Sequence, residues 1–177
     1  MDKPLEIEYK YLIRYPDVKV LEAQPGYRVE EMRQLYLELP TGFDSNGKYC
    51  RIRSSKTTEG IRFIKTFKES LSDMTRIEIE EEISQEEFTE LSKFIREGYA
   101  PISKHRHSFK LFGFTYEVDI FPFWQDRAYL EIEVDSEETK PPIPDFLSII
   151  KDVTSDIRYR NTSLSQRVIT EDMDNLT

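Results

Sequence analysis

Short segments in which apolar and charged residues alternate recur along most of the chain. Their apolar positions are rich in Ile, Val, Phe and Tyr, and turn residues separate the segments, which is typical of β-strands with one buried face. The predicted strands are Leu5–Ile13, Glu31–Leu39, Lys48–Ser55, Ile61–Glu69, Met74–Ile83, Pro101–Leu111, Phe114–Phe121 and Ala128–Asp135. The chain is therefore expected to be mainly β.

Helical patterns are fewer. Ser84 followed by Glu87 resembles a capping box, and the apolar stripe that comes after it ends before Gly98. Shorter helices are predicted over Asp17–Ala23 and Asp145–Asp152. The fold class that follows is α+β with a dominant antiparallel sheet.

The charged positions of the strands carry a second pattern. Residues two apart on a strand point to the same face, and several strands carry like charges at that spacing. These pairs are Arg51 and Arg53, Lys104 and Arg106, Glu117 and Asp119, and Glu131 and Glu133. Like charges on one face repel each other unless a ligand of the opposite sign lies between them. If the apolar faces pack outward under helices, the charged faces line a closed antiparallel barrel of about eight strands.

A solvent-exposed sheet is the simpler interpretation of any single charged strand, because antiparallel sheets often have one wet face. The set of strands favours a lumen, since its polar positions are almost wholly Glu, Asp, Arg and Lys and the signs are segregated by strand. An ionic lumen needs cations for its carboxylates and anions for its guanidinium groups. A divalent metal bound to a polyphosphate supplies both.

Composition narrows the classes of function. The 177 residues include 25 Lys and Arg against 34 Asp and Glu, a net charge of −9, so neither nucleic acid nor an anionic membrane is the expected partner. One cysteine, Cys50, excludes a disulfide framework and a CxxC metal site. No apolar run approaches the roughly 20 residues of a membrane span, and no signal-peptide core is present. We expect one domain over residues 1–177 in the cytoplasm.

The charged motifs form a recognisable series. Glu6-Ile7-Glu8-Tyr9-Lys10 has the form E-x-E-x-K at the N-terminus. The later motifs are Arg51-x-Arg53, Lys65, Arg76-x-Glu78-x-Glu80, Lys104-x-Arg106, Glu117-x-Asp119, Glu131-x-Glu133 and Tyr159-x-Asn161. In this order they resemble the CYTH superfamily, the triphosphate tunnel metalloenzymes, and most of all its small bacterial inorganic triphosphatases.

The resemblance implies a tunnel that acts on a triphosphate-containing small molecule with Mg²⁺ or Mn²⁺ as cofactor. The implied reaction is hydrolysis of the terminal phosphoanhydride, with inorganic triphosphate first among the substrates. Class IV adenylyl cyclase and thiamine triphosphatase are alternatives within the same family. A tunnel that binds polyphosphate or a nucleotide without turnover is the non-enzymatic alternative. A monomer or a homodimer is expected.

Carried over residue by residue, the motifs imply roles for individual side chains. Phosphate binding is expected of Arg51, Arg53, Lys65, Lys104, Arg106 and Arg158, because guanidinium and ammonium groups suit phosphate oxygens. Metal binding is expected of Glu6, Glu8, Asp119, Glu131 and Glu133, which offer hard oxygen ligands. Catalytic roles fall to Glu6 or Glu8, as acceptor of the proton of the attacking water, and to Lys10, which orients them or touches phosphate.

Other charged residues have supporting roles in this scheme, namely Arg76, Glu78, Glu80 and Glu117. Arg76 and Glu78 could equally pair with each other across strands. His105 and His107 alternate with the basic residues of their strand, so they are expected to point outward and not to bind metal. Trp124 is expected to close a hydrophobic seam rather than to stack on an organic group.

Overall fold

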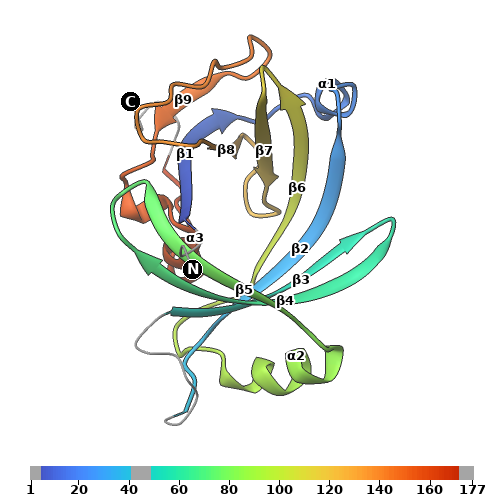
Figure 1. Ribbon diagram of the computed structural model, residues 1–177, viewed down its shortest axis with the longest axis vertical. Helices are drawn as coiled ribbons and strands as arrows, with labels where there is room; N and C mark the ends of the chain where they lie inside the picture. The colour runs from blue at the N-terminus through green and yellow to red at the C-terminus, as the bar shows by residue number, and fades with distance from the viewer. Residues whose placement is uncertain (1–4, 41–48, 172–177) are drawn as a thin grey trace.

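Within the residues that the computed structural model describes, 5–40 and 49–171, nine strands form one antiparallel sheet (Figure 1). They are β1 (Leu5–Arg14), β2 (Arg28–Leu37), β3 (Tyr49–Thr57), β4 (Gly60–Ser70), β5 (Thr75–Ile83), β6 (Ile102–Leu111), β7 (Phe114–Ile120), β8 (Arg127–Glu133) and β9 (Ile149–Asp152). The eight predicted strands correspond to β1 through β8, and β9 was not predicted.

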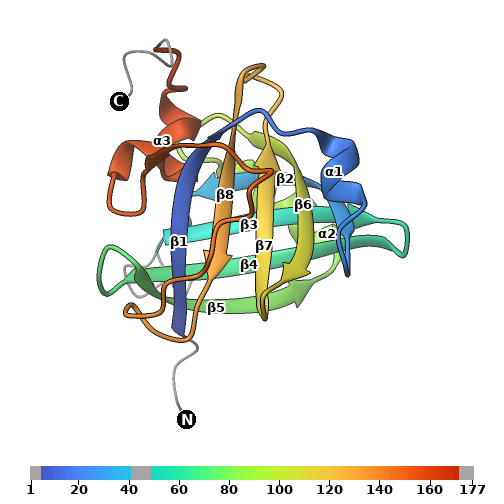
Figure 2. The same cartoon turned by 90° about the horizontal axis from the view of Figure 1, so that it is seen from above.

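The first eight strands close into a barrel. Hydrogen-bonded neighbours run from β5 through β4, β3, β2, β6, β7 and β8 to β1, and β1 pairs again with β5. In Figure 2 the strands β1, β8, β7 and β6 cross over β3, β4 and β5, so the barrel has two halves at a steep angle. The predicted closed antiparallel barrel of about eight strands is confirmed.

The predicted helix over Asp145–Asp152 is wrong, because its last residues form β9. The edge of β1 that faces β5 is shared: Leu5–Ile7 pair with β5, whereas Tyr11–Ile13 pair with β9. An unpaired strand edge leaves backbone donors and acceptors without hydrogen-bond partners, and β9 supplies these partners along the second half of β1. Leu147 packs into the apolar cluster just before this strand.

The other two predicted helices are present. Asp17 caps α1 (Val18–Glu22), and Ser84 caps α2 (Gln85–Leu91) by accepting a hydrogen bond from the backbone N–H of Glu87 at 3.1 Å. A 3₁₀ turn, Ser92–Phe94, continues α2. A 3₁₀ turn at Ile157–Tyr159 and α3 (Asn161–Gln166) follow β9 and were not predicted as helical. None of the helices in the described ranges is both long and apolar enough to cross a bilayer.

Apolar side chains cover the outside of the barrel. Helix α2 lies outside the barrel (Figure 1), and its Phe88 and Leu91 belong to one apolar cluster with Cys50 and Ile52, which are buried on the outer face of β3. A second cluster lies outside β6, β7 and β8 and includes Leu21 of α1. Burial of each such side chain contributes about 1.5–3 kcal/mol to stability. The outward direction expected for the apolar faces is therefore observed.

A third apolar cluster closes one end of the barrel on its inner face. Leu12 of β1 and Tyr129 of β8 each lie two residues from a charged inward residue of the same strand, so alternation places them on that face, and Phe121, just after β7, packs against Tyr129. Trp124 packs against Phe121 and Tyr129, and its indole N–H donates to the backbone oxygen of Ile169 at 2.8 Å. Trp124 closes a hydrophobic seam, as expected.

Candidate functional site

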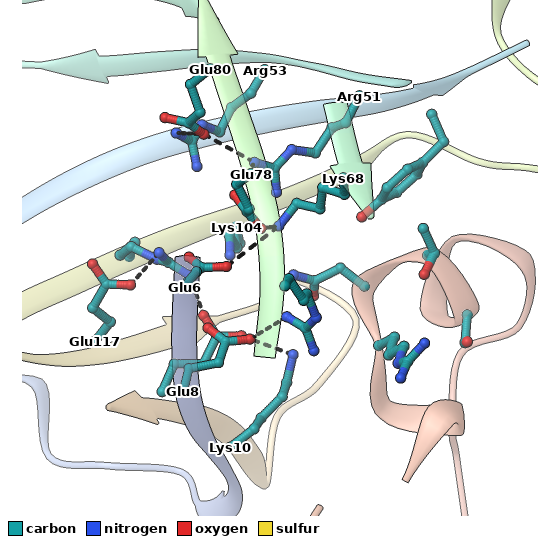
Figure 3. Close-up of a pocket in the computed structure, with 18 of the residues that line it drawn as sticks. Glu6, Glu8, Lys10, Arg51, Arg53, Lys68, Glu78, Glu80, Lys104 and Glu117 are labelled. Atoms are coloured by element: carbon teal, nitrogen blue, oxygen red, sulfur yellow. Dashed lines mark hydrogen bonds and ion pairs between the residues drawn. The ribbon is translucent and has the colours of Figure 1, made fainter. Parts of the chain in front are cut away.

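The charged faces of the strands enclose a cavity of about 640 Å³ (Figure 3). Arg51, Lys104, Glu8 and Glu131 all line it, although they come from four strands. Its basic lining residues are Lys10, Arg51, Arg53, Lys68, Arg76, Lys104, Arg106 and Arg160. Its acidic lining residues are Glu6, Glu8, Glu78, Glu80, Glu117, Glu131 and Glu133. A chain of net charge −9 therefore has a cavity in which basic groups match the acidic ones.

One wall of the cavity, on β1 and β8, concentrates carboxylates. Glu8 lies directly opposite Glu133 in the pairing of the two strands, and Glu6 shares the face of Glu8. Burial raises the pKa of Glu8, and the carboxylates of Glu131 and Glu6 raise it further. The pKa of Glu133 is raised by burial and by Glu6 and Asp135. The negative charges of this acidic wall are therefore incompletely compensated by the protein.

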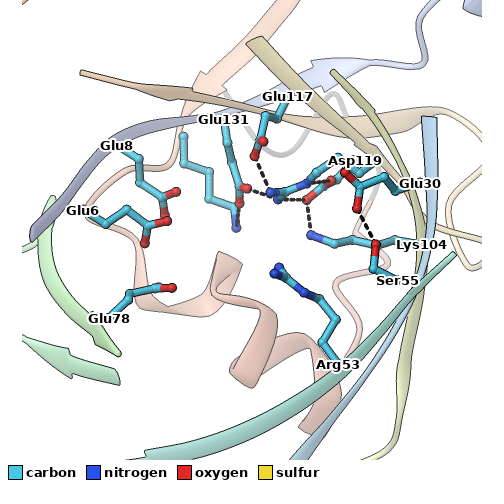
Figure 4. A network of polar contacts seen from close by, with 12 residues as sticks. Glu6, Glu8, Glu30, Arg53, Ser55, Glu78, Lys104, Glu117, Asp119 and Glu131 are labelled. Atoms are coloured by element: carbon cyan, nitrogen blue, oxygen red, sulfur yellow. Dashed lines mark hydrogen bonds and ion pairs between the residues drawn. The ribbon is translucent and has the colours of Figure 1, made fainter. Parts of the chain in front are cut away.

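Individual contacts in the acidic wall agree with this imbalance. Arg76 Nη1 lies 2.5 Å from Glu8 Oε1 and is the cation that holds this carboxylate. Glu6 Oε2 is buried without a hydrogen bond among the described residues and lies 3.9 Å from Lys68 Nζ. Figure 4 shows Glu6, Glu8 and Glu78 on one side of the lumen, with Arg53 and Lys104 pointing toward its centre from the other.

The opposite wall, which includes Arg51 and Arg53 of β3, is basic. Arg51 Nη2 donates to Thr66 Oγ1 at 3.1 Å and lies 3.4 Å from Glu80 Oε1, an oxygen that is also 3.5 Å from Arg53 Nη2 (Figure 3). The Nε atoms of both arginines are buried without a hydrogen bond in the described chain. Burial and the neighbouring Arg51 lower the pKa of Arg53 to about 10.

Two lysines complete the basic wall. Lys68 of β4 forms an ion pair with Glu78, yet burial and the charge of Arg51 lower its pKa. Lys104 of β6 forms an ion pair with Asp119, and burial together with Arg106 lowers its pKa to about 8. Depressed pKa values of neighbouring cations mean that an anion among them would be stabilised.

A network of ion pairs anchors the floor between the two walls (Figure 4). Arg106 donates from Nε and Nη2 to the two carboxylate oxygens of Asp119 at 2.7 and 2.8 Å, and it also contacts Glu117 and Glu131. Burial alone would lower the pKa of Arg106, but these three carboxylates hold it above its ordinary value. Lys10 Nζ lies 2.8 Å from Glu131 Oε1. The charges of the floor largely neutralise one another, whereas those of the two walls do not.

The CYTH domain family matches residues 4–167, which is nearly the whole chain. The chain belongs to the CYTH domain family. The resemblance of its charged motifs to that family is confirmed.

Several relatives of this CYTH domain are known. An inorganic triphosphatase of Acetivibrio thermocellus is 34% identical over 100 residues, which cover 56% of this chain and 62% of that relative. The inorganic triphosphatase NE1496 has a solved structure that is 29% identical, covers 91% of this chain and 94% of its own, and superposes with a TM-score of 0.55. HpAC1 from Hippeastrum, at 15% identity and a TM-score of 0.52, covers 75% of this chain and 81% of its own and shares the fold.

Two basic residues expected in the CYTH tunnel lie outside it. Lys65 is on the outer face of β4, where its ammonium nitrogen lies 3.0 Å from Glu81 and 2.9 Å from Glu87 of α2. Arg158 is exposed, and its Nη2 lies 2.6 Å from Asp156 Oδ2. The expectation that these residues bind phosphate is corrected by their placement, because neither lines the cavity.

The residues that were missed occupy the corresponding inward positions. Lys68 lies three residues after Lys65 and therefore on the opposite face of β4, and Arg160 lines the cavity two residues after Arg158. Tyr36 of β2 also lines it. The pairing of β4 with β3, which places Thr66 opposite Arg51, would have identified Lys68 as the inward lysine.

The pairing of Arg76 with Glu78 was also an open expectation. Arg76 instead contacts Glu8, and Glu78 contacts Lys68. Asp119 has both oxygens engaged by Lys104 and Arg106 and is fully buried, which favours an anchoring role over the metal-ligand role expected of it.

The acidic wall of the CYTH tunnel fits a divalent cation. Among the described residues, no three acidic, His or Cys groups converge as a complete metal site. Mg²⁺ is usually held by one or two carboxylates together with phosphate oxygens and water, so a complete protein cage is not required. The buried Glu6 Oε2 without a hydrogen bond and the raised pKa values of Glu8 and Glu133 are what such an ion would relieve.

Proposed function

We propose that this protein hydrolyses the terminal phosphoanhydride of triphosphate substrates, with inorganic triphosphate as the preferred one and Mg²⁺ or Mn²⁺ as the cofactor. The observation that carries the proposal is the division of one cavity into a wall of carboxylates and a wall of cations, in which the pKa values of Glu8 and Glu133 are raised and those of Arg53 and Lys104 are lowered. A polyphosphate with a divalent cation neutralises both walls at once. The names of the relatives from Acetivibrio thermocellus and of NE1496 support the same substrate class.

In this proposal the basic wall binds the phosphate oxygens. Arg51 and Arg53 present planar guanidinium groups, which match pairs of phosphate oxygens, while Lys68 and Lys104 act as point charges. Catalysis of phosphoryl transfer consists mainly of positioning and electrostatic stabilisation, so these groups also stabilise the charge that develops on the oxygens. Arg106 and Lys10 contribute through the floor, where Asp119 and Glu131 fix their positions.

The acidic wall supplies the remaining chemistry. Glu6, Glu8 and Glu133 are the carboxylates proposed to hold the cation, which when bound neutralises phosphate charge and lowers the pKa of a water molecule. Glu6 is the proposed acceptor of the proton of the attacking water, because its buried Oε2 has no hydrogen bond among the described residues, whereas Glu8 is held by Arg76. A protein that only binds an anion as a sensor would gain little from so many carboxylates. We place the enzyme in the cytoplasm, as a monomer or homodimer.

A substrate panel tests the proposed function. Phosphate release is measured from inorganic triphosphate, ATP and thiamine triphosphate, each with Mg²⁺, Mn²⁺ or chelator, and the ATP reactions are also scored for cyclic AMP. The expected result is metal-dependent release of phosphate, fastest from inorganic triphosphate. Cyclic AMP as the main product would replace the proposal with a cyclase, and binding of all three compounds without turnover would replace it with a sensor.

A further inference from the structure

Two side chains of β2, Gln34 and Tyr36, lie in the barrel beside the basic wall and have no part in the chemistry described so far. They are two residues apart and share the inward face of the strand, opposite Arg53 and Arg51 respectively. Gln34 is fully buried, and Tyr36 lines the cavity with 7% of its surface exposed. A polar pair this deep requires a hydrogen-bonding function.

The hydrogen bond between them fixes which groups remain free. The amide nitrogen of Gln34 donates to the hydroxyl oxygen of Tyr36 at 3.0 Å. An amide nitrogen only donates, so the Tyr36 oxygen is the acceptor and its own proton must be directed elsewhere. Within residues 5–40 and 49–171 this is the side-chain hydrogen bond that Tyr36 makes, and the amide oxygen of Gln34 is buried without one. The O–H of Tyr36 is therefore an unused donor at the cavity.

The surroundings indicate what would accept this proton. Burial raises the pKa of Tyr36, so the hydroxyl stays protonated at neutral pH. The Nε atoms of Arg51 and Arg53, across the strand pairing, are also buried without hydrogen bonds in the described chain. Unused donors on three neighbouring residues require an acceptor-rich ligand, and phosphate oxygens are acceptors.

We propose that Tyr36 donates its hydroxyl proton to a non-bridging oxygen of bound triphosphate, and that Gln34 holds the hydroxyl in the orientation required. This inference rests on the proposed function and deepens it. A neutral hydroxyl adds a hydrogen bond to the phosphate without adding positive charge beside Arg51 and Arg53, which already repel each other. Tyr36 is thus a substrate-binding residue, and Gln34 is a positioning residue that acts through it.

The test is a double-mutant cycle on triphosphate hydrolysis with saturating Mg²⁺. Tyr36→Phe removes one oxygen and keeps the ring that packs against Tyr99, so it should fold and lower kcat/KM about tenfold to a hundredfold, the usual effect of losing a hydrogen bond to a charged group. Gln34→Met frees the hydroxyl to rotate and should cost several-fold. The double variant should be no worse than Tyr36→Phe alone, because Gln34 acts only through that hydroxyl.

Two further variants complete the design. Tyr27→Phe is the matched control, because its hydroxyl contacts His107 at 2.8 Å and it does not line the cavity, so its kcat/KM should equal that of the wild type. Gln34→Asn replaces Gln34→Met if the latter does not fold, since its shorter amide cannot reach Tyr36.

The outcomes separate this inference from the proposed function. Wild-type kcat/KM in Tyr36→Phe, in an enzyme that hydrolyses triphosphate, overturns the role of Tyr36 and leaves the function intact. Losses that add in the double variant overturn the positioning role of Gln34. A wild-type protein that neither binds nor hydrolyses triphosphate overturns the function, and this inference with it.

Discussion

Arg53 shows the electrostatic cost of the basic wall. Its Nε has no hydrogen bond within the described chain, and its pKa is lowered by burial and by Arg51. A group held in this way stabilises the protein little but is available to a phosphate. We therefore expect its removal to affect activity far more than stability.

Arg53→Ala should raise KM for triphosphate and lower kcat/KM about tenfold or more, since a charge-assisted contact contributes about 1.5–3 kcal/mol. The melting temperature should not fall. Phosphate release and thermal unfolding measure the two effects. Lys65→Ala is the control, because Lys65 pairs with Glu81 and Glu87 outside the barrel and its loss should leave kcat/KM unchanged. A large loss of activity in Lys65→Ala together with none in Arg53→Ala would contradict the assignment of the basic wall.

The lowered pKa of Lys104 predicts that triphosphate binding depends on pH. Burial and Arg106 lower its pKa to about 8, and a bound phosphate would raise it again. Binding then takes up a proton above pH 8, so affinity is greatest below that pH and falls as pH rises, by up to about tenfold per pH unit. Lys104→Arg keeps its charge throughout this range and should remove that slope, which titration calorimetry from pH 7 to pH 9.5 can measure. Equal slopes in both proteins would show that Lys104 does not contact the phosphate.

Only part of the candidate site could be predicted from the sequence, residue by residue. Alternation along single strands correctly placed the charged pairs of β3, β6 and β8 on the cavity. It could not choose between Lys65 and Lys68, because that choice depends on how β4 pairs with β3, and strand register is a tertiary property. The role proposed for Gln34 could not be predicted, because it depends on one hydrogen bond to Tyr36.

At the scale of elements, caps were predictable and edge pairing was not. The Ser84 cap of α2 follows from local sequence, whereas the pairing of β9 with β1 depends on a free edge that exists only after the barrel has closed. The short α3 was missed as a helix, since its N-cap residue, Arg160, makes no side-chain capping hydrogen bond of the kind that Asp17 and Ser84 make.

Ser84→Ala should lower the free energy of unfolding by about 1 kcal/mol, because the Glu87 N–H loses its acceptor at the start of α2. α2 packs on the outside of the barrel, so kcat/KM for triphosphate should not change. Chemical denaturation and the phosphate assay measure the two quantities. Ser84→Asp, which restores a capping acceptor, should recover the stability, and a variant as unstable as Ser84→Ala would contradict the cap.

At the scale of the molecule, the closed barrel was predictable because like charges on one face of a strand repel each other, and a closed lumen can hold ligands that compensate them. Closure brings the acidic wall of β1 and β8 opposite the basic residues of β3, β4 and β6. The third apolar cluster, formed around Trp124 and Tyr129, closes one end of the barrel where the inward faces of the strands change from charged to apolar residues. The two walls should therefore respond to ligands together.

Melting temperatures should show this coupling. Mg²⁺ alone and a non-hydrolysable triphosphate analogue alone should each shift the melting temperature slightly, and both together should raise it by about 5–10 °C at concentrations near 100 times the dissociation constant. Glu133→Gln should reduce the effect of Mg²⁺ while preserving that of the analogue alone. Shifts that are merely additive would contradict a cation shared between the acidic wall and the phosphates.

The central claim is that one tunnel uses both walls for hydrolysis. Its most direct test is phosphate release from inorganic triphosphate by the purified protein, measured with Mg²⁺ and with excess EDTA. We predict rapid release of one phosphate per triphosphate with Mg²⁺ and none above background with EDTA. An undiminished rate in EDTA, or no release with either Mg²⁺ or Mn²⁺, would contradict it.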